Sequence, residues 1–155
     1  MDAVSAKAAP AALPAHARDI RGCGRVLVMD DEELVRDVCA RLLTRLGYEP
    51  VTTHDGAEAV RLYADAKEAN TPFDIVILDL TVPGGMGGKD AAKAILDLHP
   101  EAVILVSTGY SIDPVMAEHQ RYGFKGALAK PYRVEDITRT LADALALRAG
   151  SGKDA

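Results

Sequence analysis

The sequence predicts an α/β domain in which helices cover both faces of a doubly wound sheet of five parallel strands. Short apolar and β-branched runs alternate with longer segments whose apolar residues recur at helical spacing. The strand-like runs, above all DIVIL at residues 74–78, are apolar on both faces, as strands of a buried parallel sheet are. A chain of 155 residues with 48% hydrophobic residues is long enough for one such domain.

The first part of the chain predicts two strands, each followed by a helix. Residues 25–29 form the first strand, and the apolar stripe of the following helix ends at Gly47, a natural helix C-cap. The stripe consists of Leu34, Val35, Val38, Cys39, Leu42, Leu43 and Leu46. Residues 50–53 form a weaker strand, and the pair Asp55-Gly56 then starts a helix that stops before Pro72.

The second part alternates in the same way. In chain order we expect a strand at residues 74–78, a glycine-rich loop at 81–88, a helix that ends before Pro100, a strand at 102–106, a helix at about 113–122, a strand at 126–129 and an amphipathic helix at 134–147. Residues 1–24 and 148–155 sustain no amphipathic period, so we expect disordered tails there. The predicted domain covers residues 25–147.

Composition and charge exclude several classes of function. A formal net charge of -5 gives no electrostatic reason to expect binding to nucleic acid or to a membrane surface. No apolar stretch approaches the roughly 18 residues that a membrane span needs. Cys23 and Cys39 form neither a C-x-x-C pair nor a metal-ligand cluster. We therefore expect a cytoplasmic protein.

Polar residues follow four of the five predicted strands. They are Asp30, Asp31 and Glu32 after the first strand, Asp79 after the third, Ser107, Thr108 and Gly109 after the fourth, and Lys130-Pro131 after the fifth. Singly they have ordinary explanations, as helix-capping acids, a turn residue, a loop hydroxyl and a surface charge. Together they meet at one rim of the sheet, where such folds bind ligands. Carboxylates crowded there repel one another unless a cation lies among them.

Mg²⁺ meets that need, because it prefers hard oxygen ligands and needs only one or two carboxylates. Asp79 can then act as a nucleophile, since carboxylates form aspartyl-phosphates. The metal would neutralise one phosphoryl oxygen, Lys130 would pair with a second, and Thr108 would donate a hydrogen bond to a third. The pattern indicates phosphoryl transfer to Asp79.

Four segments carry a resemblance to a known family. VLVMDDEELVR, DIVILDLTVPGGMGGKDA, ILVSTGYS and ALAKPY resemble the receiver domain of two-component response regulators. The two glycines after Pro83 are similar to the loop of receivers in hybrid sensor histidine kinases. The resemblance implies a flavodoxin-like fold with five helices and strand order 2-1-3-4-5. It also implies phosphoryl transfer from a histidine kinase or a His-containing phosphotransfer domain, which switches contacts with a downstream protein.

The resemblance assigns a role to each matching residue. It makes Asp79 the phosphoacceptor and Asp31 the direct Mg²⁺ ligand, with Asp30 acting mainly through water. The backbone carbonyl of Thr81 completes the protein ligands, and no other cofactor is implied. The chain would be a signalling phosphoacceptor, a monomer or weak dimer that catalyses only its own phosphorylation and slow hydrolysis, and not an enzyme.

Near the end of the domain the resemblance makes Thr108 the switch hydroxyl and Lys130 the phosphate-contacting lysine, followed by a peptide to Pro131 that is cis in the family. The chain departs from the family three residues before this lysine. Members carry Tyr or Phe there, and this chain has Ala127. Either Tyr110 or Phe124 could substitute for that ring, or serve only in packing.

Two alternatives stay open. A phosphatase of the haloacid-dehalogenase type also forms an aspartyl-phosphate, but needs a second Asp two residues after the nucleophile, where this chain has Thr81. A pseudo-receiver would bind partners without phosphorylation, and Ala127 leaves room for that. The glycines at residues 84–88 fail the P-loop pattern, and we expect them to permit positive φ in an exposed loop.

Overall fold

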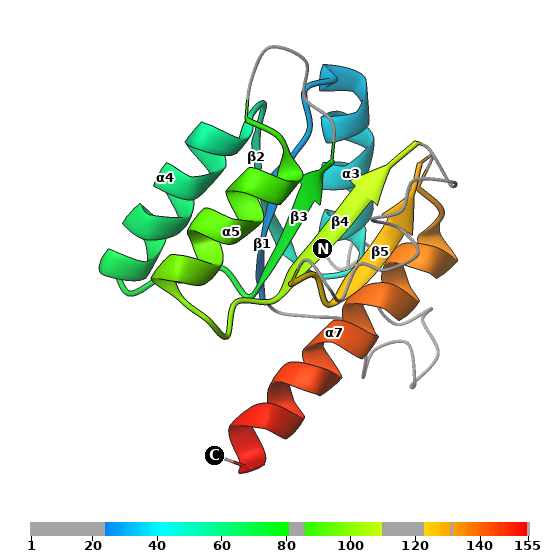
Figure 1. Cartoon of the computed structure of the whole chain (residues 1–155). Coiled ribbons are helices and arrows are strands. Elements are labelled where there is room, and N and C mark those ends of the chain that lie inside the picture. The colour runs from blue at the N-terminus through cyan, green and yellow to red at the C-terminus, as the bar shows by residue number, and fades with distance from the viewer. Residues whose placement is uncertain (1–23, 81–85, 110–122, 131, 155) are drawn as a thin grey trace, which may run out of the picture.

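A computed structural model of the chain describes residues 24–80, 86–109, 123–130 and 132–154. Five parallel strands form one sheet in the order β2-β1-β3-β4-β5, as predicted (Figure 1). The strands are β1 (Arg25–Met29), β2 (Glu49–Thr53), β3 (Ile75–Asp79), β4 (Ile104–Thr108) and β5 (Gly126–Ala129). The helices of the described residues are α3 (Glu33–Arg45), α4 (Gly56–Glu68), α5 (Gly88–Leu98) and α7 (Val134–Asp154). The helix predicted at about 113–122 lies outside them.

The sheet separates two hydrophobic clusters, because alternate strand residues point to opposite faces. The α4–α5 cluster contains buried residues of α4 and α5 together with Leu27, Met29, Val76, Leu78, Ile104, Val106 and Phe124. The α3–α7 cluster contains buried residues of α3 and α7 together with Val26, Val28, Ile75, Ile77, Val103, Leu105 and Leu128. Burial on both faces explains why the central strands are apolar throughout.

The ends of two strands differ from the prediction. The ladder continues through Asp79 on β3 and Thr108 on β4, so both residues end their strands instead of following them. Backbone hydrogen bonds extend the pairing, since Leu80 N–H donates to the carbonyl of Ser107 at 2.9 Å and Lys130 N–H to that of Thr108 at 3.0 Å. Asp79 and Thr108 are therefore held by the sheet itself.

The last helix also differs from the prediction. α7 continues to Asp154, past Leu147, where the predicted helix ends. The predicted end rested on the loss of an apolar period, which limits packing but does not stop backbone helix formation. Over the part of the chain that the structure describes, no helix has the length and apolar character of a membrane span.

Two predicted helix ends agree with the structure, and one helix face does not. Gly47, with φ of 98°, follows the end of α3, and the side chain of Asp55 caps α4 by accepting a hydrogen bond from the backbone N–H of Glu58 at 2.9 Å. On α3, however, Leu34 and Val38 are 75% and 42% exposed. The apolar stripe is wider than the surface that the sheet covers, which leaves two of its members in solvent.

Candidate functional site

The carboxyl ends of β1 and β3 bring three predicted acids together. Met29 on β1 pairs with Leu78 on β3, and the residues that follow them are Asp30 and Asp79. With Asp31, each offers a carboxylate oxygen, and these oxygens lie within 4.8 Å of one another. The parallel register thus gathers residues from distant parts of the chain at one point of the rim.

Asp30 is the most firmly held of the three acids, with 0% exposure. Its Oδ1 accepts a hydrogen bond from the backbone N–H of Glu32 at 2.9 Å, and its Oδ2 accepts one from Lys130 Nζ at 2.9 Å. The guanidinium of Arg36 donates to its backbone carbonyl at 2.7 Å. Asp31, in contrast, is exposed. Protein donors therefore hold both oxygens of Asp30, while Asp31 faces solvent.

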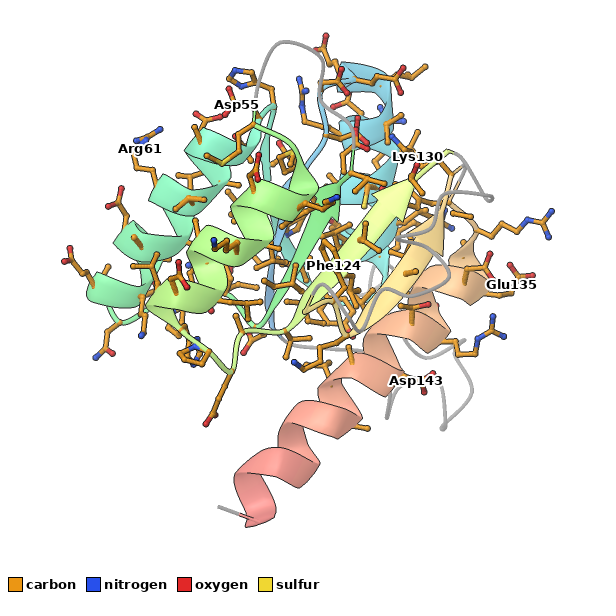
Figure 2. The ribbon with its side chains drawn as sticks, in the orientation of Figure 1. Asp55, Arg61, Phe124, Lys130, Glu135 and Asp143 are labelled. Atoms are coloured by element: carbon orange, nitrogen blue, oxygen red, sulfur yellow. The ribbon has the colours of Figure 1, made fainter. Side chains whose placement is uncertain are left out.

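Lys130 lies between two of the carboxylates. Its Nζ is 2.9 Å from Oδ2 of Asp30 and 3.4 Å from Oδ2 of Asp79. Figure 2 shows Lys130 at the edge of the sheet where the strands end. Burial lowers the pKa of Lys130, but the hydrogen bond to Asp30 and the charges of Asp79 and Asp30 outweigh burial, so its pKa is raised. The ammonium thus provides a fixed positive charge.

The acids fit a hard divalent cation. Oxygen ligands of Mg²⁺ lie about 2.0–2.1 Å from the ion, so two ligands on opposite sides are about 4.2 Å apart. The spacing of the three carboxylate oxygens is compatible with that geometry. Both oxygens of Asp30 already accept hydrogen bonds, which fits the predicted indirect role of Asp30 and leaves Asp31 as the predicted direct ligand. The predicted carbonyl ligand, Thr81, lies outside the described residues.

The hydroxyl predicted to contact phosphate comes from the neighbouring strand. β4 pairs Ser107 with Asp79, so Thr108 lies one residue beyond the phosphoacceptor candidate, and it is 2% exposed. Among the described residues, a Cβ atom added at Gly109 would meet no atom within 4 Å, which leaves space beside Thr108 in this part of the structure. The rim thus combines three acids, an ammonium, a strand-end hydroxyl and free volume. Pro131 lies outside the described residues.

Comparison with known proteins identifies this arrangement. Residues 26–142 match the family model described as the response regulator receiver domain. The chain belongs to this family. The chemotaxis protein CheY of Thermotoga maritima is 32% identical over 118 residues, which cover 76% of this chain and 93% of CheY. Its response regulator relatives are proteins of two-component systems, as the resemblance implied.

Receivers of larger proteins match as well. The sensor kinase CckA of Brucella abortus is 28% identical over 129 residues, which cover 83% of this chain but 13% of the kinase. Among solved structures, a receiver domain protein of Clostridium thermocellum superimposes with a TM-score of 0.72 at 24% identity, covering 81% of this chain and 97% of the other. The similarity to CckA is therefore confined to a receiver-sized part of that kinase.

In this receiver, glycine is needed at the start of α5 for a reason that the sequence analysis missed. A Cβ atom at Gly88 would lie 2.7 Å from the backbone oxygen of Asp79. Gly87 has a φ of -86°, and Gly88 is not among the described residues with positive φ. Close approach of two backbone segments, and not positive φ, therefore explains why residue 88 must be glycine. Gly84 and Gly85 lie outside the described residues.

The receiver's departure from the family at Ala127 is not compensated by Phe124. The ring of Phe124 is 1% exposed inside the α4–α5 cluster, where Ala127 also packs. Figure 2 shows Phe124 in the interior, well away from the rim that carries Lys130. Phe124 is a packing residue, and Tyr110 lies outside the described residues.

One contact of the rim escaped the sequence analysis. The hydroxyl of Tyr132 lies 2.5 Å from Oγ of Ser107, which is fully buried. Tyr132 is half-buried and packs against the α3–α7 cluster. The sequence signal that could have indicated this contact was Ser107, a hydroxyl residue at an inward-facing position of an otherwise apolar strand. Burial raises the pKa of Tyr132, so its phenol stays protonated around neutral pH.

Proposed function

We propose that this receiver accepts a phosphoryl group on Asp79 from a phosphohistidine and, once phosphorylated, changes its contacts with a downstream protein. The observation that carries the proposal is the position of the Asp79 carboxylate, 3.4 Å from the Lys130 ammonium and within 4.8 Å of oxygens of Asp30 and Asp31. The donor would be a histidine kinase or a His-containing phosphotransfer domain. The receiver itself would not be a turnover enzyme.

The chemistry follows from the charges at the rim. A carboxylate oxygen of Asp79 attacks the phosphorus atom, the new P–O bond forms as the P–N bond of phosphohistidine breaks, and the electron pair goes to the imidazole nitrogen. Mg²⁺, held by Asp31 and Asp79 with Asp30 in support, supplies positive charge to the phosphoryl oxygens when bound. Lys130 pairs with one of these oxygens, and the hydroxyl of Thr108 donates a hydrogen bond to another.

The exposed apolar residues of α3 support a protein as the donor. Leu34 and Val38 are one helical turn apart and lie shortly after Asp31 in the chain. Exposed apolar side chains next to a reaction centre favour a protein contact over a small substrate. We infer that the phosphodonor protein packs against this part of α3 while its phosphohistidine enters the rim.

Intact-mass spectrometry tests the proposal. The chain is incubated with acetyl phosphate and Mg²⁺, beside Asp79→Asn and a sample with a chelator. We expect an adduct of one phosphoryl group that hydroxylamine removes, and that is absent in Asp79→Asn and with the chelator. Absence of the adduct from the wild-type chain would favour the pseudo-receiver. Continuous turnover of phosphate esters would favour the phosphatase.

A further inference from the structure

The hydrogen bond between Ser107 and Tyr132 joins two segments that both carry residues of the site. Ser107 directly precedes Thr108, and Tyr132 follows Lys130 by two residues. The backbone N–H of Lys130 also donates to the carbonyl of Thr108 at 3.0 Å. The same two segments are thus tied twice, once through the backbone and once through side chains.

A tyrosine hydroxyl is not required for packing at this position. The ring of Tyr132 packs against the α3–α7 cluster, and phenylalanine would cover the same surface without a polar group to desolvate. Ser107 lies on the same side of β4 as Leu105, an apolar residue of that cluster. Each hydroxyl can be buried here without a large cost because it forms a hydrogen bond with the other. The hydrogen bond between the two hydroxyls also fixes how Tyr132 is oriented relative to Ser107, which apolar packing alone does not.

The segment that this hydrogen bond fixes is the one that carries the lysine. Lys130 has a flexible four-carbon stem, so the position of its ammonium depends on where its backbone is held. The ladder between β4 and β5 ends at Ala129. Past that point the two ties to β4 hold the backbone, together with the packing of the Tyr132 ring and the contacts of the Lys130 ammonium with Asp30 and Asp79. Displacement of a catalytic group by about 1 Å can reduce a rate by about 10²-fold.

We propose that Tyr132 is a positioning residue, whose hydrogen bond to Ser107 holds Lys130 at the distance from Asp79 that phosphoryl transfer needs. This inference rests on the proposed function. It also assigns a role to Tyr132, an aromatic residue on the α3–α7 side of the sheet. On the α4–α5 side, the chain has Ala127 at the position where the resemblance leads us to expect an aromatic residue.

Three variants test the proposal by the rate at which acetyl phosphate modifies Asp79. They are Tyr132→Phe, Ser107→Ala and the double variant. We expect each single variant to be about tenfold slower, and the double variant to be no slower than the singles, because both remove one hydrogen bond. The concentration of Mg²⁺ that gives half the maximal rate should not change, since neither residue ligates the metal; general loss of structure would change both quantities.

Tyr63→Phe is the matched control. Tyr63 is a buried tyrosine of the α4–α5 cluster whose hydroxyl lies 2.8 Å from Nδ1 of His99. Its loss removes a comparable hydrogen bond far from the rim, and we expect the wild-type rate of phosphorylation. A wild-type rate for Tyr132→Phe would overturn the positioning role while leaving the proposed function intact.

A second measurement decides the inference even if no phosphorylation occurs. Hydrogen exchange at the backbone amide of Lys130, followed by NMR without any phosphodonor, reports how firmly this segment is held to Thr108. We expect exchange to be about fivefold faster in Tyr132→Phe and in Ser107→Ala, and unchanged in Tyr63→Phe. Equal exchange in all variants and the wild type contradicts the inference.

Discussion

The ammonium of Lys130 lies 2.9 Å from Oδ2 of Asp30, although 100 positions separate the two residues in the chain. Asp30 is fully buried and the side chain of Lys130 is 16% exposed, so the pair is largely withdrawn from solvent. In such pairs the loss of one partner costs more than the pair contributes, because a buried charge is left without a counter-charge. The architecture of the rim can therefore be tested by stability measurements as well as by phosphorylation.

Lys130→Ala should lower the free energy of unfolding by about 2 kcal/mol in the presence of a chelator, since Asp30 and Asp79 then repel each other without a counter-charge. Saturating Mg²⁺ should restore part of the loss. Urea denaturation with and without Mg²⁺ provides the measurement. Arg139→Ala, which removes an exposed ion pair with Asp136, should change the stability by less than about 0.5 kcal/mol. Equal stabilities for the two variants would contradict the buried pair.

Asp31→Asn should raise the concentration of Mg²⁺ needed for half-maximal phosphorylation by about tenfold or more, because a neutral amide replaces one of the clustered carboxylates. Stability without metal should stay the same or rise slightly, since one repulsive charge is removed. The check is a titration with Mg²⁺ followed by intact mass. Glu33→Gln, an exposed acid in the first turn of α3, should leave the titration unchanged.

Leu34→Glu should slow phosphorylation by a cognate protein donor by about tenfold, since a charge then lies in the proposed contact. Phosphorylation by acetyl phosphate should keep its wild-type rate. The two rates are measured side by side, with Val134→Glu as the control because Val134 is an exposed apolar residue of α7. If both donors slow equally in Leu34→Glu, α3 does not contact the donor protein.

Gly88→Ala should destabilise the domain by about 1–3 kcal/mol, because the added Cβ atom lies 2.7 Å from the backbone oxygen of Asp79 and forces α5 outward. The same substitution at Gly109, where the added atom meets no described residue within 4 Å, should change stability by less than about 0.5 kcal/mol. Thermal and urea denaturation of the two variants distinguish a steric requirement from a general cost of replacing glycine.

The carboxylate of Glu58 gives an expected pH dependence. The hydrogen bond from the hydroxyl of Thr53 lowers its pKa, and the nearby charges of His54 and Arg61 add to the effect. A lowered folded-state pKa contributes stability above the unfolded value of about 4.3, and this contribution is lost as pH falls through the folded pKa. Stability, measured by urea denaturation over a series of pH values, should therefore fall below about pH 4.3 less steeply in Glu58→Gln than in the wild-type chain.

The sequence predicts the sheet and the clustered residues of the rim for one physical reason. Strands buried on both faces are apolar throughout, and the polar residues that end them have few places to lie except the rim. The sequence pattern alone therefore indicates Asp30, Asp79 and Lys130. It missed that Asp79 and Thr108 belong to the strands, because ladder hydrogen bonds depend on the neighbouring strand and not on side-chain polarity.

Contacts between distant segments account for the remaining differences. The need for glycine at residue 88 comes from the approach of a backbone atom nine residues earlier, which no local pattern encodes. Exposure of Leu34 and Val38 depends on how far the sheet extends beneath α3. The bond between Ser107 and Tyr132 joins residues 25 positions apart, and each residue alone resembles ordinary loop or packing chemistry.

The alternation along β4 has a consequence for signalling. Thr108 continues the row of Ile104 and Val106, which faces α5, whereas Ser107 continues the row of Val103 and Leu105, which faces α7. A shift of the strand end toward a phosphoryl group thus moves side chains on opposite faces of the sheet in one event. If Asp79 is phosphorylated as proposed, two binding proteins, one on each side of the molecule, would therefore respond to the same strand-end movement.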